Sequence, residues 1–277
     1  MPILFGLLSA LMIGSSDFLG ARSAGRTTAL QTTTAAFLGG AIAVGLYSPF
    51  LGAPDRYDLW LGALSGVAVF VALTTLWFGY SRSSIGIAGP VAAVVSTVLP
   101  VLWRAAHGEV PGGLGWIGML VGVGALLLTS WAPRRADGYR EVRDGVVLGA
   151  LGGIAFAAMF LIAVSTSEGS GTWPVVTQRF TAFVLACTAG VLTRQRPFAD
   201  ADSVRWSVLA GVFGASGVAA TVWAGQRGPL APVVVAASLY PAVAVGLAWI
   251  FLGDHLSRRQ VVGLVAALTG VVLIALD

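Results

Sequence analysis

Charge is scarce in this chain: Asp, Glu, Lys and Arg make up 10% of its 277 residues, against about a quarter in ordinary soluble domains. Lysine is absent, so all 16 basic residues are arginine. A single cysteine, Cys187, excludes an intrachain disulfide and a multi-cysteine metal site. The sequence has no basic stripe with interleaved aromatic residues, which disfavours nucleic-acid binding, and no phosphate-cradling loop, which disfavours a primary pump.

Side chains for acid–base chemistry are equally scarce. Inside the apolar segments only Asp17 and Arg179 are charged. The two histidines, His107 and His255, fall in connections, where we expect them to solvate the membrane interface rather than to bind a metal. An intramembrane enzyme needs acid, base or metal-binding side chains within reach of one another. We therefore expect that the protein is not an enzyme and has no catalytic residues, no metal and no cofactor.

Hydrophobic residues, by contrast, make up 57% of the chain, and its mean hydropathy is +0.87. A helix needs about 20 mostly apolar residues to cross a bilayer core of about 30 Å. Ten segments meet this within a few residues: Ile3–Ala21, Ala29–Pro49, Leu59–Tyr80, Ile85–Trp103, Leu114–Trp131, Gly145–Ser165, Pro174–Leu192, Trp206–Gln226, Leu230–Leu252 and Gln260–Leu276. Their long apolar runs lack strand-like alternation, so they predict an all-α membrane protein with ten transmembrane helices.

The chain also repeats itself. Seven aromatic, proline and glycine positions recur in the same order, 141 to 146 residues further on. The first set is Trp60, Trp77, Gly79, Pro90, Pro100, Gly108 and Gly118, and the second is Trp206, Trp223, Gly225, Pro232, Pro241, Gly253 and Gly263. We predict two five-helix repeats, residues 1–132 and 145–277, joined by a polar connecting loop over 133–144. An odd number of crossings inverts the second repeat, and inverted repeats are typical of secondary transporters.

The arginines predict the orientation in the membrane. Twelve lie in connections after odd-numbered segments and three after even-numbered ones, while Arg179 lies within a segment. The twelve are Arg22, Arg26, Arg82, Arg134, Arg135, Arg140, Arg143, Arg194, Arg196, Arg205, Arg258 and Arg259. Basic residues favour cytoplasmic connections, so we expect the odd connections in the cytoplasm and both termini outside.

Several short motifs occur once in each half. An aromatic-glycine stretch, Trp77-Phe78-Gly79-Tyr80 or Trp223-Ala224-Gly225-Gln226, precedes a proline-containing segment. That segment ends in an acidic turn, Gly108-Glu109 or Gly253-Asp254, with Gly118 or Gly263 at the same spacing beyond it. The opening Gly14-Ser15-Ser16-Asp17-Phe18 adds a polar run to the first segment.

In these motifs and their order, the chain resembles the ten-helix drug/metabolite transporters built from two EamA domains. The resemblance implies a secondary transporter of the plasma membrane that moves a small organic metabolite or drug by alternating access, as an exporter. It further implies a cavity lined by the third, fourth, eighth and ninth helices, with a proton or ion as the coupling partner and the lipid bilayer as surroundings. Family members are usually drawn with both termini in the cytoplasm, opposite to the orientation that the arginines predict.

Asp17 is the first candidate site residue. It lies in the first segment, and an ionised carboxylate at membrane depth costs about 2.5–3.5 kcal/mol, so it should face the bundle interior or a water-filled cavity. One interpretation is a carboxylate that couples to a proton or binds a cation. The other is a hydrogen-bonded cap near the interface, helped by Ser15 and Ser16.

Arg179 is the deepest basic residue, about seven residues or 10 Å into its segment. Facing a cavity, its planar donor fork would favour a carboxylate or phosphate on the substrate. Alternatively, its long stem extends toward the connection that carries Glu168. Gln178 precedes it and is a second candidate from the same segment.

The remaining candidates repeat between the halves. Trp77, Tyr80, Ser96, Trp223 and Tyr240 are predicted to line the cavity, although single aromatic residues also form the interfacial belt of membrane proteins. The prolines predict either hinges between the halves or plain kinks. These prolines are Pro90, Pro100, Pro232 and Pro241. A non-transporting receptor or assembly subunit is the alternative function, and it would need no cavity.

Overall fold

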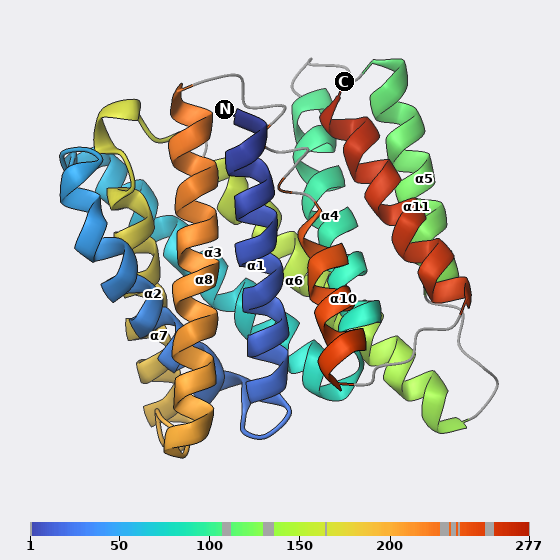
Figure 1. Ribbon diagram of the computed structural model, residues 1–277, viewed down its shortest axis with the longest axis horizontal. Coiled ribbons are helices and arrows are strands. Elements are labelled where there is room, and N and C mark those ends of the chain that lie inside the picture. The colour runs from blue at the N-terminus through green and yellow to red at the C-terminus, as the bar shows by residue number, and fades with distance from the viewer. Residues whose placement is uncertain are drawn as a thin grey trace.

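A computed structural model describes residues 2–106, 112–129, 136–163, 165–227, 233, 237, 239–252 and 258–276. Over these residues the chain contains no strand, and ten α-helices form one bundle (Figure 1). They are α1 (Pro2–Ala24), α2 (Ala29–Tyr47), α3 (Arg56–Arg82), α4 (Ile85–Ala106), α5 (Gly113–Thr129), α6 (Ala136–Ala163), α7 (Trp173–Leu192), α8 (Ala201–Arg227), α10 (Tyr240–Leu252) and α11 (Arg258–Ala275). Two short 3-10 helices, η1 (Ser48–Phe50) and η2 (Glu168–Ser170), lie in connections.

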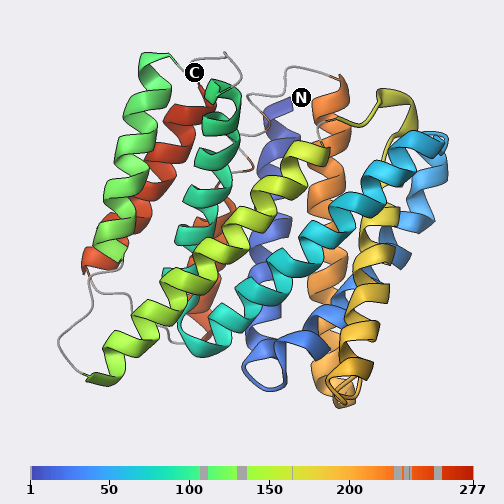
Figure 2. The ribbon, with the colours of Figure 1, turned by 180° about the vertical axis from the view of Figure 1, so that it is seen from behind.

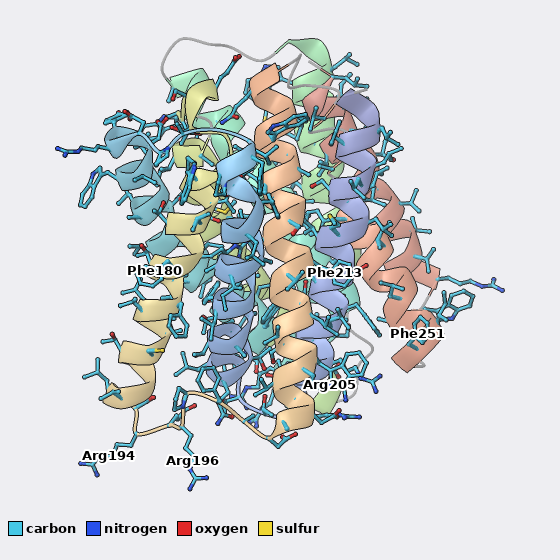
Figure 3. The ribbon with its side chains drawn as sticks, turned by 60° about the vertical axis from the view of Figure 1, so that its left-hand side comes forward. Phe180, Arg194, Arg196, Arg205, Phe213 and Phe251 are labelled. Atoms are coloured by element: carbon cyan, nitrogen blue, oxygen red, sulfur yellow. The ribbon has the colours of Figure 1, made fainter. Side chains whose placement is uncertain are left out.

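Six helices are long and apolar enough to cross a membrane, namely α1, α2 continued through η1, α3, α6, α7 and α8. The described parts of α4, α5, α10 and α11 contribute shorter apolar stretches. Phe180, Phe213 and Phe251 point outward from the bundle, as expected where lipid surrounds the helices, whereas Arg194 and Arg196 lie at its lower end (Figure 3). The predicted all-α membrane fold is confirmed, and the chain is a multi-pass membrane protein.

The two halves run in opposite directions. α1 starts at the upper face, beside the end of α11, whereas α6 starts at the lower face (Figures 1 and 2). The packing of helices also repeats between the halves, where α1 is equivalent to α6, α2 to α7 and α3 to α8. α1 packs along α8, and the equivalent pair α6 and α3 also packs together. α2 packs along α8, and the equivalent pair α7 and α3 does the same. Two further pairs, α2 with α7 and α5 with α11, join equivalent helices. This is the predicted arrangement of two inverted five-helix repeats.

Polar side chains set where several helices begin. Thr28 and Gln31 form a reciprocal capping box at the start of α2, and Asp55 accepts hydrogen bonds from two backbone N–H groups in the first turn of α3. Before α8, Asp200 accepts from the backbone N–H and the hydroxyl of Ser203, and these bonds hold the pKa of Asp200 below its ordinary value. Each cap satisfies donors that the first helical turn leaves unpaired.

The connecting loop predicted over residues 133–144 is corrected by the structure. Helix α6 begins at Ala136, so most of this stretch is helix. α3 and α8 likewise begin before the predicted Leu59 and Trp206, at Arg56 and Ala201. Acidic residues are favourable in the first turns of a helix, because its N-terminus carries partial positive charge. The polar residues in the sequence therefore indicated the limit of each apolar span. They did not indicate the residue at which the helix begins.

Close approach of helices depends on glycine at two places. A Cβ atom at Gly211 of α8 would lie 1.8 Å from the carbonyl oxygen of Ala36 in α2. On the other side of the bundle, a Cβ at Gly118 of α5 or at Gly270 of α11 would lie 2.7 Å from the carbonyl oxygen of the other glycine. Small residues let membrane helices pack backbone to backbone, and these positions admit no side chain.

We expect Gly211→Ala to lower the thermal stability of the protein in detergent, by about 1–3 kcal/mol or more, because overpacking forces α2 and α8 apart. Gly124→Ala is the matched control, since a Cβ there meets nothing within 4 Å. The control should keep or slightly raise the melting temperature, because alanine favours helix over glycine. Equal melting temperatures for both variants would contradict the close packing.

Candidate functional site

Asp17 lies where α1 meets helices from both halves. A Cβ at Gly14, three residues before it, would lie 2.6 Å from the Tyr240 carbonyl oxygen in α10, and one at Gly20 would lie 2.3 Å from the Trp77 ring in α3. α1 is thus pressed against α10 on one side of Asp17 and against α3 on the other. Asp17 is 4% exposed. The sequence places glycine where the two neighbours approach and a carboxylate between them.

The Asp17 carboxylate has few hydrogen bonds. The indole Nε1 of the fully buried Trp77 donates to Asp17 Oδ1 over 3.5 Å, which is long for a hydrogen bond. The Tyr80 hydroxyl also faces Asp17 but forms no hydrogen bond of good geometry, and Tyr240 lies within electrostatic range. A carboxylate accepts about four hydrogen bonds, so Asp17 retains capacity for a proton or a cation.

Other predicted residues lie elsewhere. Trp223 packs against Phe5 with 5.2 Å between ring centroids, and Phe5 is twelve residues, or about 18 Å, along α1 from Asp17. The hydroxyl of the buried Ser96 donates to the Ala93 carbonyl of its own helix at 3.0 Å. The structure therefore groups Asp17 with Trp77, Tyr80 and Tyr240, and it does not bring Trp223 to this group.

Gln178 and Arg179 form a second group on α7. Gln178 is 2% exposed, its Nε2 donates to Ser65 Oγ in α3 at 3.0 Å, and its Oε1 has no partner. Ser65 precedes Trp77 by twelve residues, about 18 Å along α3. Arg179 is 4% exposed, and within the described ranges no ion pair joins it to Glu168 or Asp17. The alternative, an extension of Arg179 toward the connection that carries Glu168, stays a prediction.

The described prolines occupy different positions in their helices. α4 stays helical through Pro90 and Pro100, and Pro90 is buried. Pro241 is the second residue of α10, where the missing N–H has no partner within the helix to lose. Pro232, His107 and His255 lie outside the described residues. The hinge role therefore stays a prediction.

A cleft that was not predicted opens near the lower face. It has a volume of about 440 Å³ and lies between the α1–α2 connection, α3, α6 and the α7–α8 connection. Hydroxyl and amide side chains dominate its polar lining. They are Thr27, Thr28, Thr74, Thr75, Ser81 and Gln195. Thr74 and Thr75 lie three and two residues before Trp77 in α3, and none of the Asp17 group lines the cleft. The only sequence signal was this threonine pair inside an apolar run.

The upper face is closed by hydrogen bonds. Asp58, in the first turn of α3, is 1% exposed. It accepts from the Ser167 backbone N–H at 3.1 Å, from the Ser170 hydroxyl at 2.5 Å and, in a shorter contact, from the Ser167 hydroxyl. Gln226 of α8 donates to the carbonyl oxygens of Ser167 and Gly171 at 3.1 and 3.3 Å. We call this the Asp58 latch (Asp58, Ser167, Ser170 and Gln226).

Two adjoining connections are bonded to each other beside the Asp58 latch. Trp173 Nε1 donates to the Gly52 carbonyl oxygen at 3.0 Å, and the Ala53 N–H donates to the Gly169 carbonyl oxygen at the same distance. Below them, a cavity of about 10 Å³ between Ser65, Gln178 and their neighbours has room for about one water. Hydrogen bonds thus join α3, α8 and two connections at the upper face, while the cleft opens near the lower face. Among the described residues, no cluster of His, Cys, Asp and Glu could hold a metal ion.

Comparison with known proteins agrees with this architecture. Residues 143–276 match the EamA-like transporter family. No curated protein matches the sequence. A crystal structure of another protein is similar over 98% of this chain and 95% of its own, with a TM-score of 0.69 and 17% sequence identity, which is a likeness of fold alone. The second half of this multi-pass membrane protein is therefore similar to an EamA-like transporter domain.

Proposed function

We propose that the protein is a secondary transporter of the plasma membrane that exports a small organic metabolite or drug by alternating access. The observation that carries the proposal is the under-bonded Asp17 carboxylate, buried at a junction of two inverted halves. Ionisable groups at membrane depth mark substrate and ion pathways, and inverted repeats allow one half to rock against the other around a central site. Asp17 supplies the group that a coupling proton or cation would occupy.

The difference between the two faces supports the proposed direction. The Asp58 latch fastens α3 and α8 to the α6–α7 connection at the upper face, while the cleft of about 440 Å³ opens near the lower face. The described connections after α1, α3 and α7 lie at the lower face, and two of them contain Arg26, Arg194 and Arg196, so we assign this face to the cytoplasm. A solute would then enter from the cytoplasm and leave when the latch opens.

Flux measurements test the proposal. The purified chain, reconstituted into liposomes, is expected to move at least one solute from a panel of amino acids, organic cations and phosphorylated metabolites faster than protein-free liposomes do. The flux should saturate with solute concentration and respond to an imposed proton or ion gradient. Solute binding in detergent without flux for any binding solute would instead favour a non-transporting receptor, the second candidate function.

A further inference from the structure

Arg179 is a buried cation that forms no ion pair with any residue the structure describes. It is 4% exposed, its Nε has no hydrogen-bond partner, and its one recorded electrostatic partner is the neutral Tyr47 at the end of α2. Arginine keeps its charge at any accessible pH. A buried charge that is neither paired nor hydrogen-bonded is strongly unfavourable for folding. A functional role would explain why such a group is present.

The helices around Arg179 supply no anion to pair with it. α7 packs against α2, α3 and α8, and α2 and α7 contain no Asp or Glu. The one acidic residue of α8, Asp202, lies in its first turn and pairs with Arg26 at 3.2 Å. α3 carries Asp58, whose carboxylate is engaged by Ser167 and Ser170. Within the part of the chain that the structure describes, no helix packed against α7 therefore supplies a counter-charge.

Neutral polar groups border the same region. The Tyr47 hydroxyl donates to Ser216 Oγ of α8 at 3.4 Å, a weak bond that both groups can exchange for another partner. Gln178, next to Arg179, lines the cavity of about 10 Å³. This space holds about one water and no organic solute, so access to Arg179 requires α7 to move relative to its neighbours. Alternating access would supply this movement.

We propose that Arg179 binds a carboxylate or phosphate group of the transported solute, which makes the solute an anion or a zwitterion. The planar guanidinium fork can donate two parallel hydrogen bonds to either oxyanion, and the hydroxyls of Tyr47 and Ser216 are additional donors. This inference rests on the proposed transport function for its access route. The binding itself is measurable without transport.

The test compares the thermal stability of the full chain, delipidated in a maltoside detergent, with and without added anions. Inorganic phosphate and succinate are titrated against sodium chloride at matched ionic strength, since a ligand that binds only the folded protein raises the melting temperature. We expect stabilisation by at least one of the two, with apparent affinity about 30-fold or more weaker in Arg179→Gln. Arg179→Lys, which keeps the charge but not the fork, should lie between.

Arg205→Gln is the matched control, because Arg205 is an exposed arginine near the lower end of α8 (Figure 3). It should respond to the anions as the unmodified protein does. Without ligand, Arg179→Gln should be at least as stable as the unmodified protein, because it removes an unpaired buried charge, whereas a purely structural arginine would make this variant less stable.

Three results would overturn the site. The first is no stabilisation by either anion beyond that of chloride, and the second is equal stabilisation of Arg179→Gln and the unmodified protein. The third is stabilisation by added phosphatidylglycerol only, which would show that Arg179 binds a lipid headgroup. Anion binding that depends on Arg179, combined with no flux in liposomes, would leave the site standing and remove the transport function. Flux in liposomes without this anion binding would support the transport function and remove the Arg179 site.

Discussion

An Asp58→Ala variant is expected to lose about 3 kcal/mol or more of unfolding free energy, seen as a lower melting temperature in detergent. Asp58 accepts three hydrogen bonds from Ser167 and Ser170. Hydrogen bonds to a charged group contribute about 1.5–3 kcal/mol each, and removal of the acceptor also leaves covered donors unpaired. The α6–α7 connection at the upper face would lose the group that fastens it to α3.

Asp202→Ala is the control for that loss. Asp202 and Arg26 form an ion pair whose side chains are about half exposed, at 55% and 52%. Exposed pairs contribute about 0–1 kcal/mol, so this variant should melt within a few degrees of the unmodified protein. If the two aspartate variants melt together, the Asp58 latch contributes no more than a surface contact.

The same latch gives a prediction about conformation. Ser65 lies below it, beside the small upper cavity, and is 2% exposed. In a background with Cys187→Ala, which removes the single native cysteine, a Ser65→Cys variant should react slowly with a membrane-impermeant maleimide. Addition of Asp58→Ala should speed this reaction, because the upper face opens more often. An unchanged rate would show that other contacts keep the face closed.

Lipid made the helices predictable from sequence. A backbone in hydrocarbon must satisfy its own hydrogen bonds, so long apolar runs allow little besides a helix. The ends were less predictable, because outside the hydrocarbon a helix continues as long as caps and charges favour it. Asp55 extends α3 to Arg56, and α6 starts at Ala136, nine residues before the predicted Gly145.

The candidate site was predictable in part. Asp17 stands out because a carboxylate within an apolar run is costly, and Trp77 stands out because it recurs in the second half. Asp58 does not stand out, since an acidic residue three positions after the capping Asp55 is common in a first helical turn. Its partners lie 109 and 112 residues away along the chain. Such pairings follow from how the helices pack together, which no local pattern records.

The largest functional effect is expected from Asp17→Asn, which should reduce gradient-driven flux about 100-fold, or about 2.7 kcal/mol in barrier height. Asparagine has the shape of aspartate, and its carbonyl oxygen can still accept from Trp77 Nε1, which lies 3.5 Å from Asp17 Oδ1. Only the charge and the ability to take up a proton are lost. Because the variant removes a buried carboxylate with few partners, folding and thermal stability should be retained or improved.

A comparison of flux with stability separates coupling from structure. Asp17→Glu keeps an acid and should retain part of the flux, while Glu141→Gln, which changes an exposed acid on α6, should transport normally. Trp77→Phe removes the indole donor to Asp17 and should shift the pH at which flux is half-maximal rather than abolish transport. Wild-type flux in Asp17→Asn, still driven by the same gradient, would show that the coupling proton or cation binds elsewhere and that Asp17 is a structural acid.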